Sequence, residues 1–122
     1  MANPNIINVS TIRGRTYANV LTTSNVLQVI NPASSGNILK INNIVVSNVD
    51  GTSAADVSIE INNAAGSGTA YRIVSTVAVP ADASLIVTDK STSFYLEENS
   101  SIKAFASANS DLEIVISYDM IT

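Results

Sequence analysis

Ala-Asp-Val-Ser-Ile-Glu-Ile-Asn, residues 55–62, alternates apolar and polar side chains along its length. A second stretch, Leu112–Met120, repeats the pattern with an apolar residue at every other position. Successive side chains of a β-strand point to opposite faces of the sheet, so a period of two predicts a strand with one buried face. We therefore expect an all-β fold with Ile59 and Ile116 in its core.

Further segments are rich in Ile, Val and aromatic residues and are bounded by turn formers. These residue types favour strands because they are stiff at χ1 and pack well on a pleated surface. Within the longest of these segments the parity of the apolar residues changes at Asn42-Asn43, which predicts a β-bulge. We expect these strands over residues 26–30, 38–49, 71–79, 85–87, 94–96 and 102–106.

Turn-forming residues separate the expected strands. Asp50-Gly51 is the strongest hairpin signal in the chain and predicts that the strands on either side of it pair with each other. The Gly-rich run 64–69 is also expected to be a hairpin loop. About eight short strands separated by such turns predict an antiparallel β-sandwich of jelly-roll-like type, with an up-and-down barrel as the alternative.

The chain has 122 residues, which is the size of one domain. Residues 25–122 carry the regular pattern and are expected to form the β-sandwich domain. Residues 1–24 are less regular, and we expect either an N-terminal arm that docks on a neighbour or an ordinary edge segment of the sandwich.

Composition argues against several kinds of chemistry. The chain contains no Cys and no His, so it has no thiol nucleophile and lacks the commonest general base and transition-metal ligand. Its six cations are scattered in a chain of net charge −4, whereas nucleic-acid binding normally needs a basic patch. No apolar run approaches the roughly 20 residues that cross a bilayer. We expect neither nucleic acid nor membrane as a partner.

Carboxylates are the remaining candidates for catalysis. Glu97 and Glu98 are adjacent, so on a strand they point to opposite faces and do not form a pair. Asp111, Glu113 and Asp119 are interpreted as charges on a solvated face. We therefore expect no catalytic residue and no enzyme activity.

Four aspartates at or near turns, Asp50, Asp56, Asp82 and Asp89, are the candidate calcium ligands. The stretch 50–56 lacks the alternating oxygen ligands and the closing Glu of an EF-hand loop. Because turn chemistry explains these residues, we expect no metal and no cofactor.

The predicted surface is rich in Ser, Thr, Asn and Ala, and only 13% of all residues are charged, against about 25% in an average globular protein. Few charges and few Pro leave strand edges poorly protected against pairing. Low charge also lowers the cost of removing water from an interface. These features favour a subunit that is packed beside other subunits.

The part of the chain from about residue 38 to the end resembles small virion structural proteins of tailed bacteriophages, particularly those of marine phages such as cyanophages. The resemblance is carried by five stretches, Ile41–Gly51, Val79–Lys90, Phe94–Glu98, Ser101–Ala108 and Leu112–Asp119. Proteins of this group are β-sandwich subunits of heads, necks or tails, with no known catalytic residues. The resemblance therefore implies a non-enzymatic virion protein. Because residues 1–5 show no pattern of a secretory signal, we expect it to be made in the host cytoplasm.

Within that group we expect a head decoration (cement) protein that binds the outside of the major capsid protein shell and associates with its own copies. A neck, collar or tail subunit is the first alternative, and a carbohydrate- or receptor-binding module is the second. The residues expected to contact the partner lie in the N-terminal segment, namely Ile6, Ile7, Arg13 and Arg15.

Overall fold

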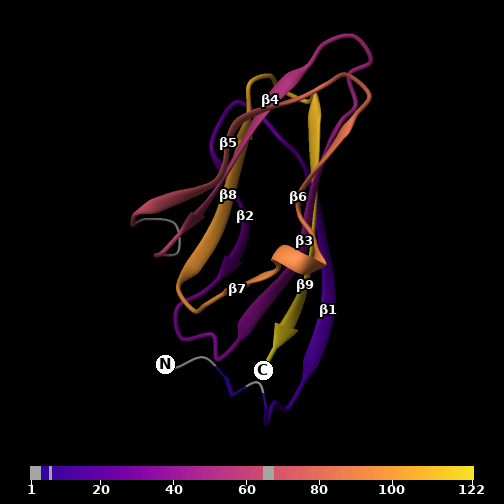
Figure 1. The fold of residues 1–122 in the computed structure, drawn as a ribbon. Helices are drawn as coiled ribbons and strands as arrows, with labels where there is room; N and C mark the ends of the chain where they lie inside the picture. The colour runs from indigo at the N-terminus through magenta and orange to yellow at the C-terminus, as the bar shows by residue number, and fades with distance from the viewer. Residues whose placement is uncertain (1–3, 6, 65–67) are drawn as a thin grey trace.

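The computed structural model describes residues 4–5, 7–64 and 68–122, and these form nine β-strands and one short 3-10 helix, η1 (Lys90–Thr92). The strands make two antiparallel sheets that face each other (Figure 1). Sheet A has the order β1 (Ile12–Val20), β9 (Leu112–Ile121), β3 (Ile38–Asn48) and β6 (Ser84–Thr88), with β7 (Phe94–Leu96) also paired to β3. Sheet B has the order β2 (Val26–Asn31), β8 (Ser100–Ala106), β4 (Ala55–Asn62) and β5 (Ala70–Val79).

The chain passes from one sheet to the other at every connection except those between β4 and β5 and between β6 and β7. This connectivity is that of a jelly roll, in which two sheets are wound together from one folded ribbon. The prediction of an antiparallel β-sandwich is confirmed. The alternative of an up-and-down barrel is wrong, because the two sheets do not join and each keeps two edges.

The segment predicted to be an arm or an edge contains β1, which pairs with β9 from Ile12 opposite Ile121 to Val20 opposite Glu113. β1 forms one edge of sheet A. The preceding residues are tied to the C-terminus, since the amides of Ser10 and Thr11 both donate to the carbonyl oxygen of Thr122.

The predicted hairpin at Asp50-Gly51 is wrong, because β3 lies in sheet A and β4 lies in sheet B. The connection crosses the sandwich and is held by Asn48, whose buried amide donates to the carbonyl oxygens of Ser53 and Val79, both at 2.9 Å. The Asp50 carboxylate caps the same connection by accepting from the Thr52 amide at 2.9 Å. A crossing between sheets needs these polar contacts because it has no strand partner of its own.

Two other local predictions are confirmed. Ile41 pairs with Tyr118 and Asn43 pairs with Ser117, so Asn42 is the extra residue of a β-bulge. The run 64–69 does join paired strands, since β4 and β5 are antiparallel neighbours. Residues 65–67 of that run lie outside the described residues.

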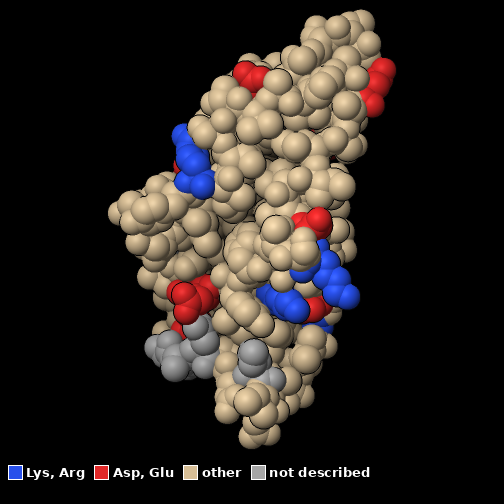
Figure 2. Space-filling model, in the orientation of Figure 1, with Lys and Arg blue, Asp and Glu red and all other residues tan. Residues whose placement is uncertain are grey.

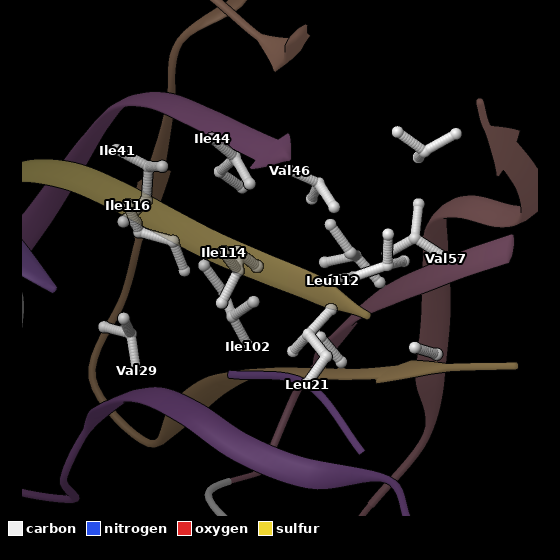
Figure 3. Close-up of a cluster of buried hydrophobic side chains, with 14 of the residues drawn as sticks. Leu21, Val29, Ile41, Ile44, Val46, Val57, Ile102, Leu112, Ile114 and Ile116 are labelled. Atoms are coloured by element: carbon white, nitrogen blue, oxygen red, sulfur yellow. The ribbon is translucent and has the colours of Figure 1, made fainter. Parts of the chain in front are cut away.

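The core fills the space between the sheets and consists of Ile, Val, Leu and Ala side chains (Figure 3). Ile59 of β4 and Ile116 of β9 are both fully buried, as their parity predicts. Full burial of one such side chain contributes about 1.5–3 kcal/mol relative to exposure. The bulge in β3 keeps Ile41 and Ile44 on the same buried face, so one extra residue preserves the core.

Both sides of β4 are buried, whereas a period of two predicts one buried side. Ser58, Glu60 and Asn62 are all buried although they point away from the core. The alternation of sides along β5 is also interrupted, because extra residues in this strand bring Val74, and not Ile73, opposite Ile59. Bulges change which residue faces the core, and a period of two does not reveal where they fall.

Two isoleucines of sheet A provide a test of this packing. Ile116 is fully buried, whereas Ile86 is 65% exposed. Ile116→Ala should lower the free energy of unfolding by about 2–5 kcal/mol, and Ile86→Ala by about 0.5 kcal/mol or less. Urea denaturation of the two variants measures the difference. Equal losses would contradict the assignment of the faces of sheet A.

Candidate interaction surface

The face of sheet A that points away from sheet B, here called the outer face of sheet A, is organised in rows by the strand register. Directly paired residues of antiparallel strands point to the same side of a sheet. Ala18 pairs with Val115, Val115 pairs with Val45, and Val45 pairs with Ile86. Four strands therefore place four apolar side chains in one row across this face, and we call this set the apolar row.

The apolar row is accessible to solvent. Ile86 is 65% exposed and Val115 is 39% exposed, Ala18 is exposed, and Val45 is partly buried. On one side of it lies an uncharged row made of Thr16, Ser117 and Asn43. On the outer face of sheet A, the charged residues Lys40, Glu113 and Asp119 lie outside these two rows. The view in Figure 2 shows charged residues on a minor part of a largely uncharged surface. Such a surface loses little hydration energy when another molecule covers it.

A shallow hollow of about 370 Å³ borders the apolar row where β1 lies beside β9. Ala18, Val20 and Val115 supply apolar side chains to its lining, and Glu113 supplies a carboxylate. The sequence carries a signal for this surface, because Val45 and Val115 are apolar residues at positions where the alternation predicts polar ones. The signal was missed because register across four strands is needed to see the row.

The outer face of sheet B has a different chemistry. The Glu60 carboxylate accepts from the Asn25 amide at 2.7 Å and lies 3.4 Å from Nε of Arg72. The Arg72 guanidinium also lies over the ring of Phe105, 5.2 Å from its centre. A buried carboxylate with a hydrogen bond and an ion pair is satisfied within the fold, and removal of one partner would leave the charge uncompensated. This group stabilises the sheet, and both oxygens of the Glu60 carboxylate are engaged in it.

The residues predicted to contact a partner are placed as follows. Ile6 lies outside the described residues. Ile7 is 93% exposed in a turn in which the Asn8 amide donates to the carbonyl oxygen of Asn5. Arg13 and Arg15 lie on β1 and are exposed. The structure therefore places Ile7 before the edge strand and the two arginines on it.

Arg13 and Arg15 do not belong to the outer face of sheet A. They pair with Met120 and Tyr118, whose side chains point toward sheet B. The arginines remain exposed because this edge of the sandwich is open. Arg13 lines a cleft of about 280 Å³ together with Thr11, Asn37, Met120 and Thr122.

Farther along the same edge, Gln28 links the two sheets. It is the extra residue of a bulge in β2, and its side chain is buried. Its Oε1 accepts from the Tyr17 hydroxyl at 3.1 Å and from the Asn19 amide at 3.4 Å. Two polar contacts thus fix β1 to β2 where apolar packing ends.

The candidate catalytic and metal residues are dispersed. Among the residues that the structure describes, no group of three or more Asp or Glu is arranged to hold a metal ion. Glu98 accepts from the Gly36 amide at 3.2 Å. Glu113 and Asp119 lie on the outer face of sheet A, opposite Val20 and Gly14 of β1.

Two of the aspartates considered for calcium have hydrogen-bond donors of their own. Asp89 caps η1, and the hydroxyl and then the amide of Ser91 lower its pKa below the ordinary value. The amide of Thr52, and then its hydroxyl, lower the pKa of Asp50 in the same way. The donors favour the charged carboxylate, so these side chains act as turn caps.

These caps predict an acid-dependent loss of stability. Because both pKa values are lower in the folded state, the stabilisation is present at neutral pH and is lost as the pH falls below about 4, through the folded pKa values. Between pH 5 and pH 2, the melting temperature of the natural chain should therefore fall further than that of an Asp50→Asn/Asp89→Asn variant, whose caps do not titrate. Identical pH profiles for the two proteins would show that the caps do not couple to folding.

Comparisons with known proteins give one distant likeness. No family model matches this chain, and no curated protein matches it. A solved structure described as Bacillus endospore appendages that form a novel family of disulfide-linked pili is similar over 92% of this chain and 87% of its own, with 15% sequence identity and a TM-score of 0.49. The present chain contains no cysteine.

In the part of the chain that the structure describes, no helix is long and apolar enough to cross a membrane.

Proposed function

We propose that this protein is a non-enzymatic structural subunit of a tailed-phage virion, and specifically a decoration protein that binds the outside of the major capsid shell. The observation that carries the proposal is the apolar row on the outer face of sheet A, formed by Ala18, Val115, Val45 and Ile86. An exposed apolar patch of this kind, bordered by polar residues, is typical of a protein contact site. The resemblance of residues 38–122 to phage virion proteins supplies the kind of assembly.

The proposed action is mechanical. A subunit that binds the assembled shell, and not its separated parts, stabilises the shell by mass action. Covering the apolar row removes Val115 and Ile86 from water and contributes roughly 25 cal/mol per Å² of apolar surface. The four residues of the apolar row are themselves uncharged, so little of that gain is offset by desolvation of ions within the row.

The copy number of the chain in purified virions tests the proposed role. Quantitative mass spectrometry against the major capsid protein should give a ratio near one, or a simple fraction such as one per capsomer. A decoration protein repeats with the lattice that it covers, which is the reason for this expectation. A few copies per particle would instead indicate a neck or tail subunit, and absence from the particle would contradict a virion role.

The contact face can be tested with two lysine substitutions at exposed positions. Val115→Lys places a charge in the apolar row, and Tyr71→Lys places one on β5 of sheet B, where Tyr71 is 58% exposed. Val115→Lys should weaken binding to shells stripped of the protein, measured by co-sedimentation, while Tyr71→Lys should bind as the natural chain does. The melting temperatures of both variants serve as the control for folding. Unimpaired binding by Val115→Lys would exclude the outer face of sheet A.

A further inference from the structure

The edges of the two sheets are not equivalent. In β2, β5 and β6 the register against the neighbouring strand shifts, and each shift leaves an extra residue on the edge strand. The extra residues are Gln28 in β2, Val87 in β6, and two in β5, where Thr76 adopts a left-handed conformation with φ of 53°. β7, which shares an edge with β6, is three residues long. Bulges and short strands are the devices that prevent an edge from pairing with another strand.

β1 has neither device. Its nine residues pair with β9 without a register shift, from Ile12 to Val20, and it contains no proline. Eight of the nine residues are exposed. On its free side, alternate backbone N–H and C=O groups therefore point outward in a regular row, as antiparallel pairing requires. Of the described edges, this one is built to accept a further strand.

β1 also carries a charge pattern. Arg13 and Arg15 are two residues apart and hence on the same side of the strand, while its other residues are neutral. Among the described residues, neither guanidinium has a carboxylate partner within the distance of an ion pair. Two of the six cations of an acidic chain thus lie on the regular edge, without a carboxylate partner among the described residues.

We propose that β1 binds an extended segment of another protein by antiparallel strand addition, and that this segment carries Asp or Glu at two alternating positions. Main-chain hydrogen bonds along β1 supply affinity, as in other cases of strand addition, and side chains supply specificity. A carboxylate opposite Arg13 and a second opposite Arg15 would share one side of the sheet with them. Side chains of the added strand would meet the hollow beside Ala18 and Val20 on one side of β1, and the cleft beside Arg13 on the other.

A second copy of this chain is the less suitable occupant. If two β1 strands pair over all nine residues, the centre of the pair is Thr16, and Arg13 and Arg15 then face Asn19 and Tyr17. Four guanidiniums gather on one side of the joined sheet without a carboxylate. Repulsion among these guanidiniums opposes pairing between two copies, whereas a strand that carries carboxylates would be attracted.

The test uses the full chain labelled for NMR and a synthetic nine-residue peptide of alternating Thr and Val with Glu at two central alternating positions. The peptide should slow hydrogen exchange at alternate amides of β1. It should bind roughly two- to twenty-fold more tightly than the same peptide with Gln in place of Glu, because each exposed ion pair adds a small factor. Arg15→Glu should abolish the preference for the Glu peptide over the Gln peptide. The double variant Arg13→Glu/Arg15→Glu should instead prefer a peptide with Lys at the two positions.

Lys90→Glu is the matched control, because it reverses one exposed cation in η1, away from β1, and should leave the preference unchanged. A Glu peptide methylated at its backbone nitrogens should not bind, and retained binding would show that ion pairing occurs without strand addition. Slowed exchange in β2 or β5 instead of β1, or equal affinity for the Glu and Gln peptides, would overturn the proposal. If the natural chain forms dimers in which hydrogen exchange at the β1 amides is slowed, the proposal is also overturned, because β1 then pairs with a second copy of itself.

The peptide measurements involve no virion. The β1 proposal and the decoration role can therefore fail independently.

Discussion

The structure depends on the burial of one apolar side from each of two sheets that never close into a barrel. The core joins Ile41, Ile44, Ile114 and Ile116 of sheet A to Val57, Ile59 and Ile102 of sheet B. The large side chains that are fully buried among the described residues are all aliphatic. Two open sheets expose four edges, and each edge must be protected or used. The bulges described in the edge strands β2, β5 and β6 protect those edges, whereas the bulge in the internal strand β3 keeps its apolar residues on the buried side.

Of the described edges, those formed by β2, by β5 and by β6 with β7 are protected, and that of β1 is regular. The sides of the molecule therefore differ. The regular edge, β1, adjoins the outer face of sheet A through Ala18 and Val20, which line the hollow beside Val115. The edge and the apolar row thus form one continuous surface, which offers main-chain groups along β1 and exposed apolar side chains beside it. The opposite side of the molecule is stabilised internally, since Glu60 is satisfied by Asn25 and Arg72. In the proposed role, the side that carries β1 and the apolar row would contact the shell, and the outer face of sheet B would not.

Sequence periodicity predicts the parts of this fold in which one side of a strand is buried, such as β4 and β9. It does not reveal β1, because the inward positions of that strand hold Arg13, Arg15 and Asn19, and the open edge never requires them to be apolar. Asp50-Gly51 marks a turn in the sequence, but a turn does not specify which sheet the next strand enters. The apolar row combines four segments that are distant in the chain, so only the strand register brings Ala18, Val115, Val45 and Ile86 together.

A cryo-electron microscopy reconstruction of the assembled particle, at a resolution that separates strands, tests the central claim most directly. The account predicts that the outer face of sheet A lies against a neighbouring protein and that a strand from that neighbour continues the sheet beyond β1. The outer face of sheet B should then point to solvent. A reconstruction in which Val115 and Ile86 face solvent, with β5 or β2 at the contact, would contradict the account.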